Sequence, residues 1–193
     1  DIFHNINPTL KKKIYNHHIQ NGGMTRTEKI KIYLEWVTGK EPNTKILKKF
    51  VENFGNLVLE KILNVPDVIG CIQFLKKYKS IINFHIVSAT PEKELKFILK
   101  NRGLNNFFDL TYGSPNTKIT NIKMIMEKKK LNIKECLMIG DSINDFKAAT
   151  ACNIKFWGRE INENKKIFPK KTFTFNNFRD PKFTDKIQAF YNL

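Results

Sequence analysis

The sequence has few cysteines and no apolar run long enough to cross a membrane. Its three cysteines, Cys71, Cys136 and Cys152, are odd in number, form no C-x-x-C pair and lie in apolar stretches. We therefore expect reduced, buried thiols rather than a disulfide framework. A membrane span needs about 18 consecutive apolar residues, and residues 1–15 lack the pattern of a signal peptide. These absences predict a soluble, cytoplasmic protein with no membrane partner.

Acidic residues are also scarce. The 193 residues include 34 Lys and Arg but only 18 Asp and Glu, which gives a formal net charge of +16. Such an excess can indicate a nucleic-acid partner. Here the lysines are spread along the whole chain, and the denser runs at 11–13 and 128–130 lie beside helical periodicity, which favours solvated helix faces. Because no nucleic-acid motif accompanies the charge, we expect no specific nucleic-acid binding.

The first third of the chain has helical periodicity throughout. Thr25 to Glu28 matches a capping box, apolar residues follow on one helix face, and Gly39 ends that helix. A chain of this length can bury one core beside a smaller lobe. We therefore assign residues 1–62 to an all-helical lobe.

From Pro66 onward, helix-like and strand-like segments alternate. Helices are expected over residues 65–78, from Thr90 as a cap to Gly103, over 116–130 and over 143–152. Strands are expected over 81–87, 108–112, 136–139 and 154–157. Residues 158–182, which include the alternating Phe173 and Phe175, are expected to hold a loop and a short edge strand. This alternation predicts a parallel α/β sheet, so we assign residues 63–193 to a Rossmann-like core. Ligands of such sheets bind beyond the carboxyl ends of the strands, where Ser88, Ser114 and Asp141 all fall.

The segment from Gly140 to Asp145 is the sharpest chemical signal. It follows an apolar strand and places Asp141 and Asp145 on a loop and in a first helical turn, where both carboxylates can converge on a divalent cation. A second interpretation needs no metal: Ser142 can cap the helix, with Asp145 as the carboxylate of its first turn. By itself, the segment does not separate the two.

Three motifs in order give a more specific resemblance. An apolar strand ending in Ser88, a basic Lys118 after the next strand, and residues 136–145 resemble the second, third and fourth motifs of the haloacid dehalogenase-like (HAD) superfamily. Residues 4–62 resemble the helical cap of the branch that contains phosphoglycolate phosphatases and β-phosphoglucomutases. The resemblance implies an α/β, HAD-like, Rossmann-like core with an all-helical cap.

The resemblance also implies roles for individual residues. Ser88 and the backbone N–H of Ala89 would bind phosphate near a helix N-terminus. Lys118 would steady the nucleophile and the phosphoryl group, and Asp141 and Asp145 would hold Mg²⁺. The family often has proline after this lysine, whereas Ile119 follows here, yet Lys118 is a better candidate than Lys123.

A loop in the helical lobe is the candidate for substrate specificity. Residues 21–26, Asn-Gly-Gly-Met-Thr-Arg, lead into the capped helix and resemble the cap loop that contacts the non-reacting part of the substrate in this branch. Arg26 can grip a phosphate or carboxylate with its planar guanidinium. The alternative is a solvent-exposed arginine at a helix start.

The family's first motif, a strand followed by two aspartates one residue apart, has no match in these residues. Asp1-Ile2-Phe3-His4 carries no second carboxylate at that spacing. We expect the motif, with the nucleophile and the general acid/base, to lie upstream of Asp1. Its strand is central in the family's sheet, so its absence would leave a gap between two strands.

These patterns together predict a Mg²⁺-dependent phosphatase that acts on a small phosphorylated metabolite through an aspartyl-phosphate intermediate. Residues 1–193 alone should be inactive because they lack the nucleophile. Alternatives are a sugar-phosphate mutase of the same superfamily, or a catalytically silent HAD domain that binds a phosphorylated ligand or a protein. We expect a monomer or a weak dimer.

Overall fold

The computed structural model describes residues 3, 5–22, 24–160 and 166–192. The chain divides into two compact units, residues 1–65 and 66–193, each of which is described by itself. The division falls three residues beyond the predicted boundary, because the last helix of the first unit continues to Asn64. Among the described residues, no helix is long and apolar enough to cross a membrane.

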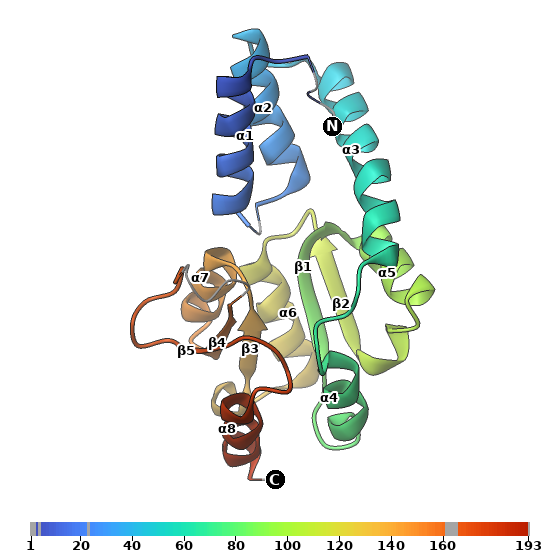
Figure 1. Ribbon diagram of the computed structural model, residues 1–193. Helices are drawn as coiled ribbons and strands as arrows, with labels where there is room; N and C mark the ends of the chain where they lie inside the picture. The colour runs from blue at the N-terminus through green and yellow to red at the C-terminus, as the bar shows by residue number, and fades with distance from the viewer. Residues whose placement is uncertain (1–2, 4, 23, 161–165, 193) are drawn as a thin grey trace. The chain divides into compact units, whose positions relative to one another are not determined.

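The first unit consists of three helices, α1 (Pro8–Gln20), α2 (Arg26–Thr38) and α3 (Thr44–Asn64) (Figure 1). The predicted capping box of α2 is confirmed: Glu28 N–H donates to the Thr25 hydroxyl at 3.3 Å, and Thr25 N–H donates to the Glu28 carboxylate at 2.9 Å. The helix ends at Gly39, whose φ of 70° is the left-handed conformation that favours glycine. The buried face of α2 forms the centre of this unit's core, with Ile30, Tyr33 and Leu34.

The second unit is an α/β fold with parallel strands, which confirms the predicted fold class. Its elements are α4 (Cys71–Tyr78), β1 (His85–Pro91), α5 (Glu92–Asn101), β2 (Leu110–Ser114), α6 (Lys118–Lys129), β3 (Leu137–Gly140), α7 (Ile143–Ala151), β4 (Lys155–Arg159), β5 (Phe173–Phe175) and α8 (Pro181–Tyr191). Every strand pair is parallel. The short edge strand expected within residues 158–182 is present as β5.

Several predicted element boundaries differ from those in the structure, two of them at helix starts. The helix expected from Val65 begins only at Cys71, because Gly70 has a φ of 79° and the preceding residues form an irregular segment that ends in a turn. The carbonyl of Ile69 in that segment accepts from Phe178 N–H at 2.9 Å. Thr90 does not cap α5, because β1 continues through Pro91, and Pro91 itself occupies the N-cap position without a side-chain bond.

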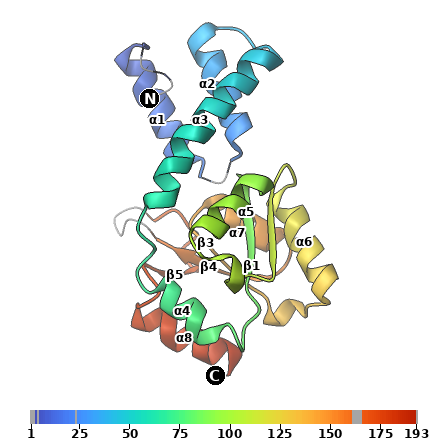
Figure 2. The ribbon, with the colours of Figure 1, turned by 90° about the vertical axis from the view of Figure 1, so that its right-hand side faces the viewer.

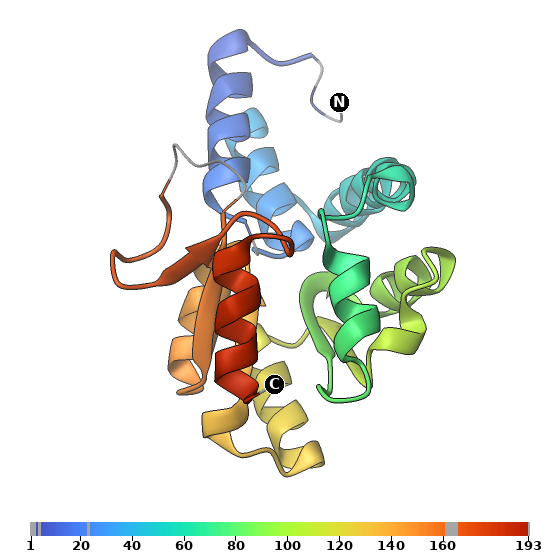
Figure 3. The ribbon, with the colours of Figure 1, turned by 60° about the horizontal axis from the view of Figure 1, so that its bottom comes forward.

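Helices cover both faces of the strands (Figure 3). On one face, α4 and α8 pack on β4 and β5 around an aromatic core that includes Phe74, Trp157, Phe175 and Phe183. On the other, α6 and α7 pack through Ile122, Ala148 and Cys152 against Val87 and Met138. Successive residues of β3 therefore point to opposite faces, as the pleat requires. Cys71, Cys136 and Cys152 are free thiols, but only Cys152 is buried.

The described strands form two sheets, β1–β2 and β3–β4–β5 (Figure 2). Among these strands, β1 pairs only with β2, and β3 is at the edge of its sheet, so one edge of each lacks a strand partner. A cavity of about 500 Å³ lies between them. Its lining comes from β1 (His85, Val87), β3 (Leu137, Met138, Ile139), α6 (Ile122, Ile125, Met126) and α8 (Phe190, Tyr191), among others. We call this cavity the inter-sheet slot.

The slot leaves β1 and β3 less buried than β4. Every residue of β1 and β3 is half-buried, including Val87 and Ile139, whereas Trp157 of β4 is 1% exposed. The strand predicted at 81–87 is also shorter than expected at its start, because Ile81 and Ile82 close a turn onto the Tyr78 carbonyl. The slot therefore lies between two half-buried strands, β1 and β3.

Candidate functional site

The loop between β3 and α7 is a capping box centred on Asp145. Ser142 donates to the Asp145 carboxylate from its backbone N–H at 3.1 Å and from its hydroxyl at 2.7 Å, and Asp145 N–H donates back to the Ser142 hydroxyl at 3.2 Å. A Cβ on Gly140 would lie 2.4 Å from the Cβ of Asp145, so only glycine fits before this loop. The helix-cap interpretation of Asp145 is therefore realised, and it fixes where the carboxylate points.

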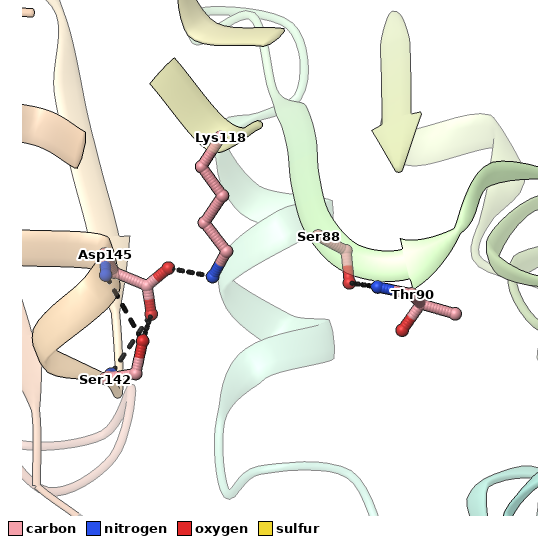
Figure 4. Close-up of polar contacts among 5 residues, drawn as sticks. All are labelled: Ser88, Thr90, Lys118, Ser142 and Asp145. Atoms are coloured by element: carbon pink, nitrogen blue, oxygen red, sulfur yellow. Dashed lines mark hydrogen bonds and ion pairs between the residues drawn. The ribbon is translucent and has the colours of Figure 1, made fainter. Parts of the chain in front are cut away.

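Lys118 provides a cation for the same carboxylate. It is the first residue of α6, behind the Thr117 N-cap, where a positive charge is disfavoured by the helix dipole. Its ammonium pairs with Asp145, and both side chains are largely buried, 15% and 7% exposed (Figure 4). The compensating anion expected at Lys118 is thus Asp145, supplied by a different helix.

Ser88 lies in an irregular part of β1, because the register to β2 shifts between Val87 and Pro91. Its hydroxyl accepts from Thr90 N–H at 3.1 Å, so in Figure 4 it turns toward the backbone of Thr90 rather than toward Lys118. Ala89 does not line the neighbouring cavity, whereas Ser88 does. Ser88 therefore lines the site cavity, and its hydroxyl is hydrogen-bonded within the irregular part of β1.

One cavity of about 330 Å³ collects four of the predicted residues. Ser88, Lys118, Asp141 and Asp145 all line it, together with Val68, Val87, Met138, Ile139, Gly140 and Arg159. Of the two carboxylates in this cavity, that of Asp141 is exposed to solvent, whereas that of Asp145 is buried. The sheet edge predicted from the strand order therefore does bring these side chains together. Ser114, at the end of β2, is not among the residues that line the cavity.

The acidic residues fit a divalent cation in part. Two carboxylates of the kind that Mg²⁺ prefers face one cavity. Asp145 is already engaged by Ser142 and Lys118, and no cluster of three or more potential ligands occurs within the described ranges. A complete site therefore needs at least one further oxygen ligand from outside this set.

Arg159 is a site residue that the sequence analysis missed. It is the last residue of β4, and one of its terminal nitrogens, Nη1, lies 3.9 Å from the Asp141 carboxylate. The predicted strand stopped at Trp157, which left Arg159 in a loop. Its position directly after a strand, at the same sheet edge as Ser88 and Asp141, is the signal that could have revealed it.

The site cavity and the inter-sheet slot share three lining residues. Val87, Met138 and Ile139 line both. His85 lies deeper in the slot, where neither ring nitrogen has a hydrogen-bond partner among the described residues. Burial lowers the pKa of His85, because the apolar surroundings disfavour the charged ring. Because Val87, Met138 and Ile139 line both cavities, a segment lying in the slot would have one end near the site.

Arg26 belongs to the first unit, at the start of α2. Its guanidinium lies 5.6 Å from the centroid of the Phe54 ring, and it lines a cavity of about 240 Å³ together with His18, Lys29 and Tyr33. Burial lowers the pKa of Lys29 there. Of the loop at 21–26, Gly23 lies outside the described residues, as do three of the four residues Asp1-Ile2-Phe3-His4.

Comparison with known proteins identifies the family of this chain. A model of the haloacid dehalogenase-like hydrolase family matches residues 27–158, which include Ser88, Lys118, Asp141 and Asp145. No curated protein sequence matches this chain.

Solved structures of that family share the fold. A predicted phosphoglycolate phosphatase from Haemophilus somnus is 21% identical, with 93% of this chain and 87% of that chain covered and a TM-score of 0.71. A β-phosphoglucomutase from Clostridium difficile is 20% identical, with coverage of 97% and 82% and a TM-score of 0.70. A HAD-hydrolase from Bacillus subtilis, solved with bound magnesium, is 16% identical, with coverage of 97% and 84% and a TM-score of 0.66. The chain belongs to the haloacid dehalogenase-like hydrolase family.

Proposed function

We propose that this protein is a Mg²⁺-dependent phosphatase that hydrolyses a small phosphorylated metabolite. The observation that carries the proposal is the convergence of Ser88, Lys118, Asp141 and Asp145 on one cavity at the carboxyl edge of the strands. These positions match the second, third and fourth motifs of the family. The magnesium-bound relative supports the choice of metal.

The residues of the site would divide the work as follows. Lys118, held by Asp145, presents a fixed positive charge to phosphoryl oxygens, and Ser88 adds a short polar contact. Asp141, with Asp145 beside it, would hold Mg²⁺. When bound, the ion offsets negative charge on the phosphoryl group. The fixed cap around Asp145 keeps these groups oriented before substrate arrives.

We also propose that the nucleophilic aspartate and the general acid/base come from a strand that fills the inter-sheet slot. No residue that lines the site cavity combines a free carboxylate with a neighbouring acid/base: Asp145 is paired, and Asp141 is assigned to the metal. A strand in the slot would end in the site, which places its last carboxylates beside Lys118. Attack by the first would give an aspartyl-phosphate, which water then hydrolyses.

The test is turnover of phosphate esters by the full-length protein. We expect Asp141→Ala to abolish Mg²⁺-dependent activity and Asp145→Ala to weaken it, because a hard-ion site loses affinity with each ligand charge removed. Asp185→Ala, an exposed acid on α8, is the matched control and should retain full activity. Undiminished turnover in Asp141→Ala would refute the assignment.

A sugar-phosphate mutase is the second candidate, favoured by the likeness to a β-phosphoglucomutase. Product analysis separates the two, since a phosphatase releases inorganic phosphate whereas a mutase returns the phosphoryl group to a sugar. A silent domain would bind a phosphorylated ligand without either product. We further propose a cytoplasmic monomer or weak dimer that binds neither nucleic acid nor membranes.

A further inference from the structure

Arg159 and Asp141 are neighbours because of backbone register. In the parallel pair of β3 and β4, Leu137 is level with Lys155 and Gly140 with Gly158. The next positions along the two strands are Asp141 and Arg159. Residues at matching positions of adjacent strands project from the same face of a sheet. Asp141 directly follows β3 and Arg159 ends β4, so the two residues lie at the same edge of the sheet, where Nη1 of Arg159 is 3.9 Å from the Asp141 carboxylate.

The guanidinium of Arg159 lines the site cavity and is only partly satisfied by its described neighbours. Its side chain is 24% exposed, and its Nε is buried without a hydrogen-bond partner in the described part of the chain. Its contact with Asp141, 3.9 Å from Nη1 to the nearer oxygen, is an ion pair rather than a hydrogen bond. A buried donor without a partner is costly, so this nitrogen is suited to an acceptor that arrives with a ligand.

The ligand chemistry follows from the neighbours. Arg159 lines the same cavity as Ser88 and Lys118, and the carboxylate of Asp145 is already paired with Lys118. Arginine presents several donors in one plane, which matches the oxygens of a phosphate or carboxylate. We propose that Arg159 is a second oxyanion-binding cation of this cavity, kept in place by Asp141 on the adjacent strand. This inference rests on the proposed function for the identity of the anion, a phosphoryl group.

This arrangement has a consequence that a purely structural arginine would not have. Replacing Arg159 removes a donor for the anion, but it also removes the positive charge beside Asp141. Anion binding should therefore weaken, whereas binding of a divalent cation at Asp141 should be retained or become tighter. General damage to the site would weaken both.

The experiment measures binding of inorganic phosphate and, separately, of Mg²⁺ to the full-length protein by titration calorimetry. For Arg159→Gln we expect phosphate affinity to fall about tenfold, as for the loss of a charge-assisted hydrogen bond. We expect Mg²⁺ affinity to be unchanged or to rise by up to about fivefold. Lys155→Gln removes one charge from the other end of β4, where the side chain is exposed, and should leave both affinities unchanged.

A measurement on the unaltered protein covers the case in which Arg159→Gln fails to fold. The Nε–H resonance of Arg159, assigned by its absence in Arg159→Lys, should shift when phosphate is added. Unchanged phosphate affinity in a folded Arg159→Gln variant, an unshifted resonance, or no phosphate binding by the unaltered protein would each overturn the inference. These measurements need no turnover. A catalytically silent domain that binds phosphate through Arg159 would support this inference and contradict the proposed function. An active enzyme whose phosphate affinity does not depend on Arg159 would support the proposed function and contradict this inference.

Discussion

Lys118 and Asp145, 27 residues apart in the sequence, form an ion pair that links the first turn of α6 to the first turn of α7. Asp145 also closes the capping box with Ser142, so one carboxylate both pairs with a lysine and caps the start of α7. The two helices lie on the same face of the strands, and the pair fixes their N-terminal ends together at the site. Stability and site geometry are therefore coupled at these two residues.

Replacing this lysine should destabilise the protein as well as inactivate it. Lys118→Met leaves the Asp145 carboxylate, 7% exposed, without its cation, and we expect a loss of about 3 kcal/mol in the free energy of unfolding. Lys123→Met, the same substitution on an exposed position of α6, should change it by less than about 0.5 kcal/mol. Urea unfolding of the two variants checks this. Equal effects would show that the pair contributes nothing to stability.

Acid should destabilise the fold through His85. Its pKa is lowered by burial in the slot, whereas in the unfolded chain the ring titrates near its ordinary value of about 6.5. The contribution of the neutral ring is thus present above pH 6.5 and is lost as the pH falls toward the lowered pKa, because the unfolded state binds the proton first. Urea midpoints between pH 7 and 5 should fall less steeply in His85→Phe than in the unaltered protein. Parallel curves would argue against a buried neutral ring.

Arg26 should affect specificity rather than chemistry. Arg26→Ala is expected to raise KM for the natural substrate more than for a small aryl phosphate, because only the former has a distal part to contact in the helical unit. A severalfold difference in kcat/KM between the two substrates is the expected size for a lost charged hydrogen bond. Lys45→Ala, an exposed position on α3, is the control and should alter neither. Equal effects on both substrates would show that Arg26 does not contact the distal part of the substrate.

The inter-sheet slot should accept a parallel strand. We expect residues 1–193 alone to show weak folding cooperativity and no phosphatase turnover. Addition of the upstream segment, as a peptide or in the same chain, should restore both. A segment with proline at its centre is the control, since proline cannot complete a central strand. Amide hydrogen exchange of β1 and β3, each of which has one edge without a partner among the described strands, should slow on addition of the segment.

Two results would contradict this. Turnover by residues 1–193 alone, at an ordinary enzymatic rate of about 1 per second or more, would place the nucleophile within the chain. Equal rescue by the proline-containing segment would show that strand pairing is not what restores activity.

The sequence by itself determined the fold class, the helical first unit and the family. These rest on local signals: the capping box at Thr25, the end of α2 at Gly39, and the Gly140–Asp145 segment after an apolar strand. Such signals can be recognised because each depends on residues close together in the chain. Where a boundary depended on a distant contact it was missed, as at Gly70, where a Cβ would lie 2.8 Å from the side chain of Arg179.

Only the tertiary structure decided which site residues contact one another. Whether Asp145 serves as a helix cap or is free for a metal could not be settled from residues 140–145, because its lysine partner comes from α6. Arg159 reaches the site because it ends β4, which pairs in parallel with β3, and Asp141 directly follows β3. The slot likewise arises from which strands lie side by side, since strand order and register are set by packing between distant segments that local sequence patterns do not encode.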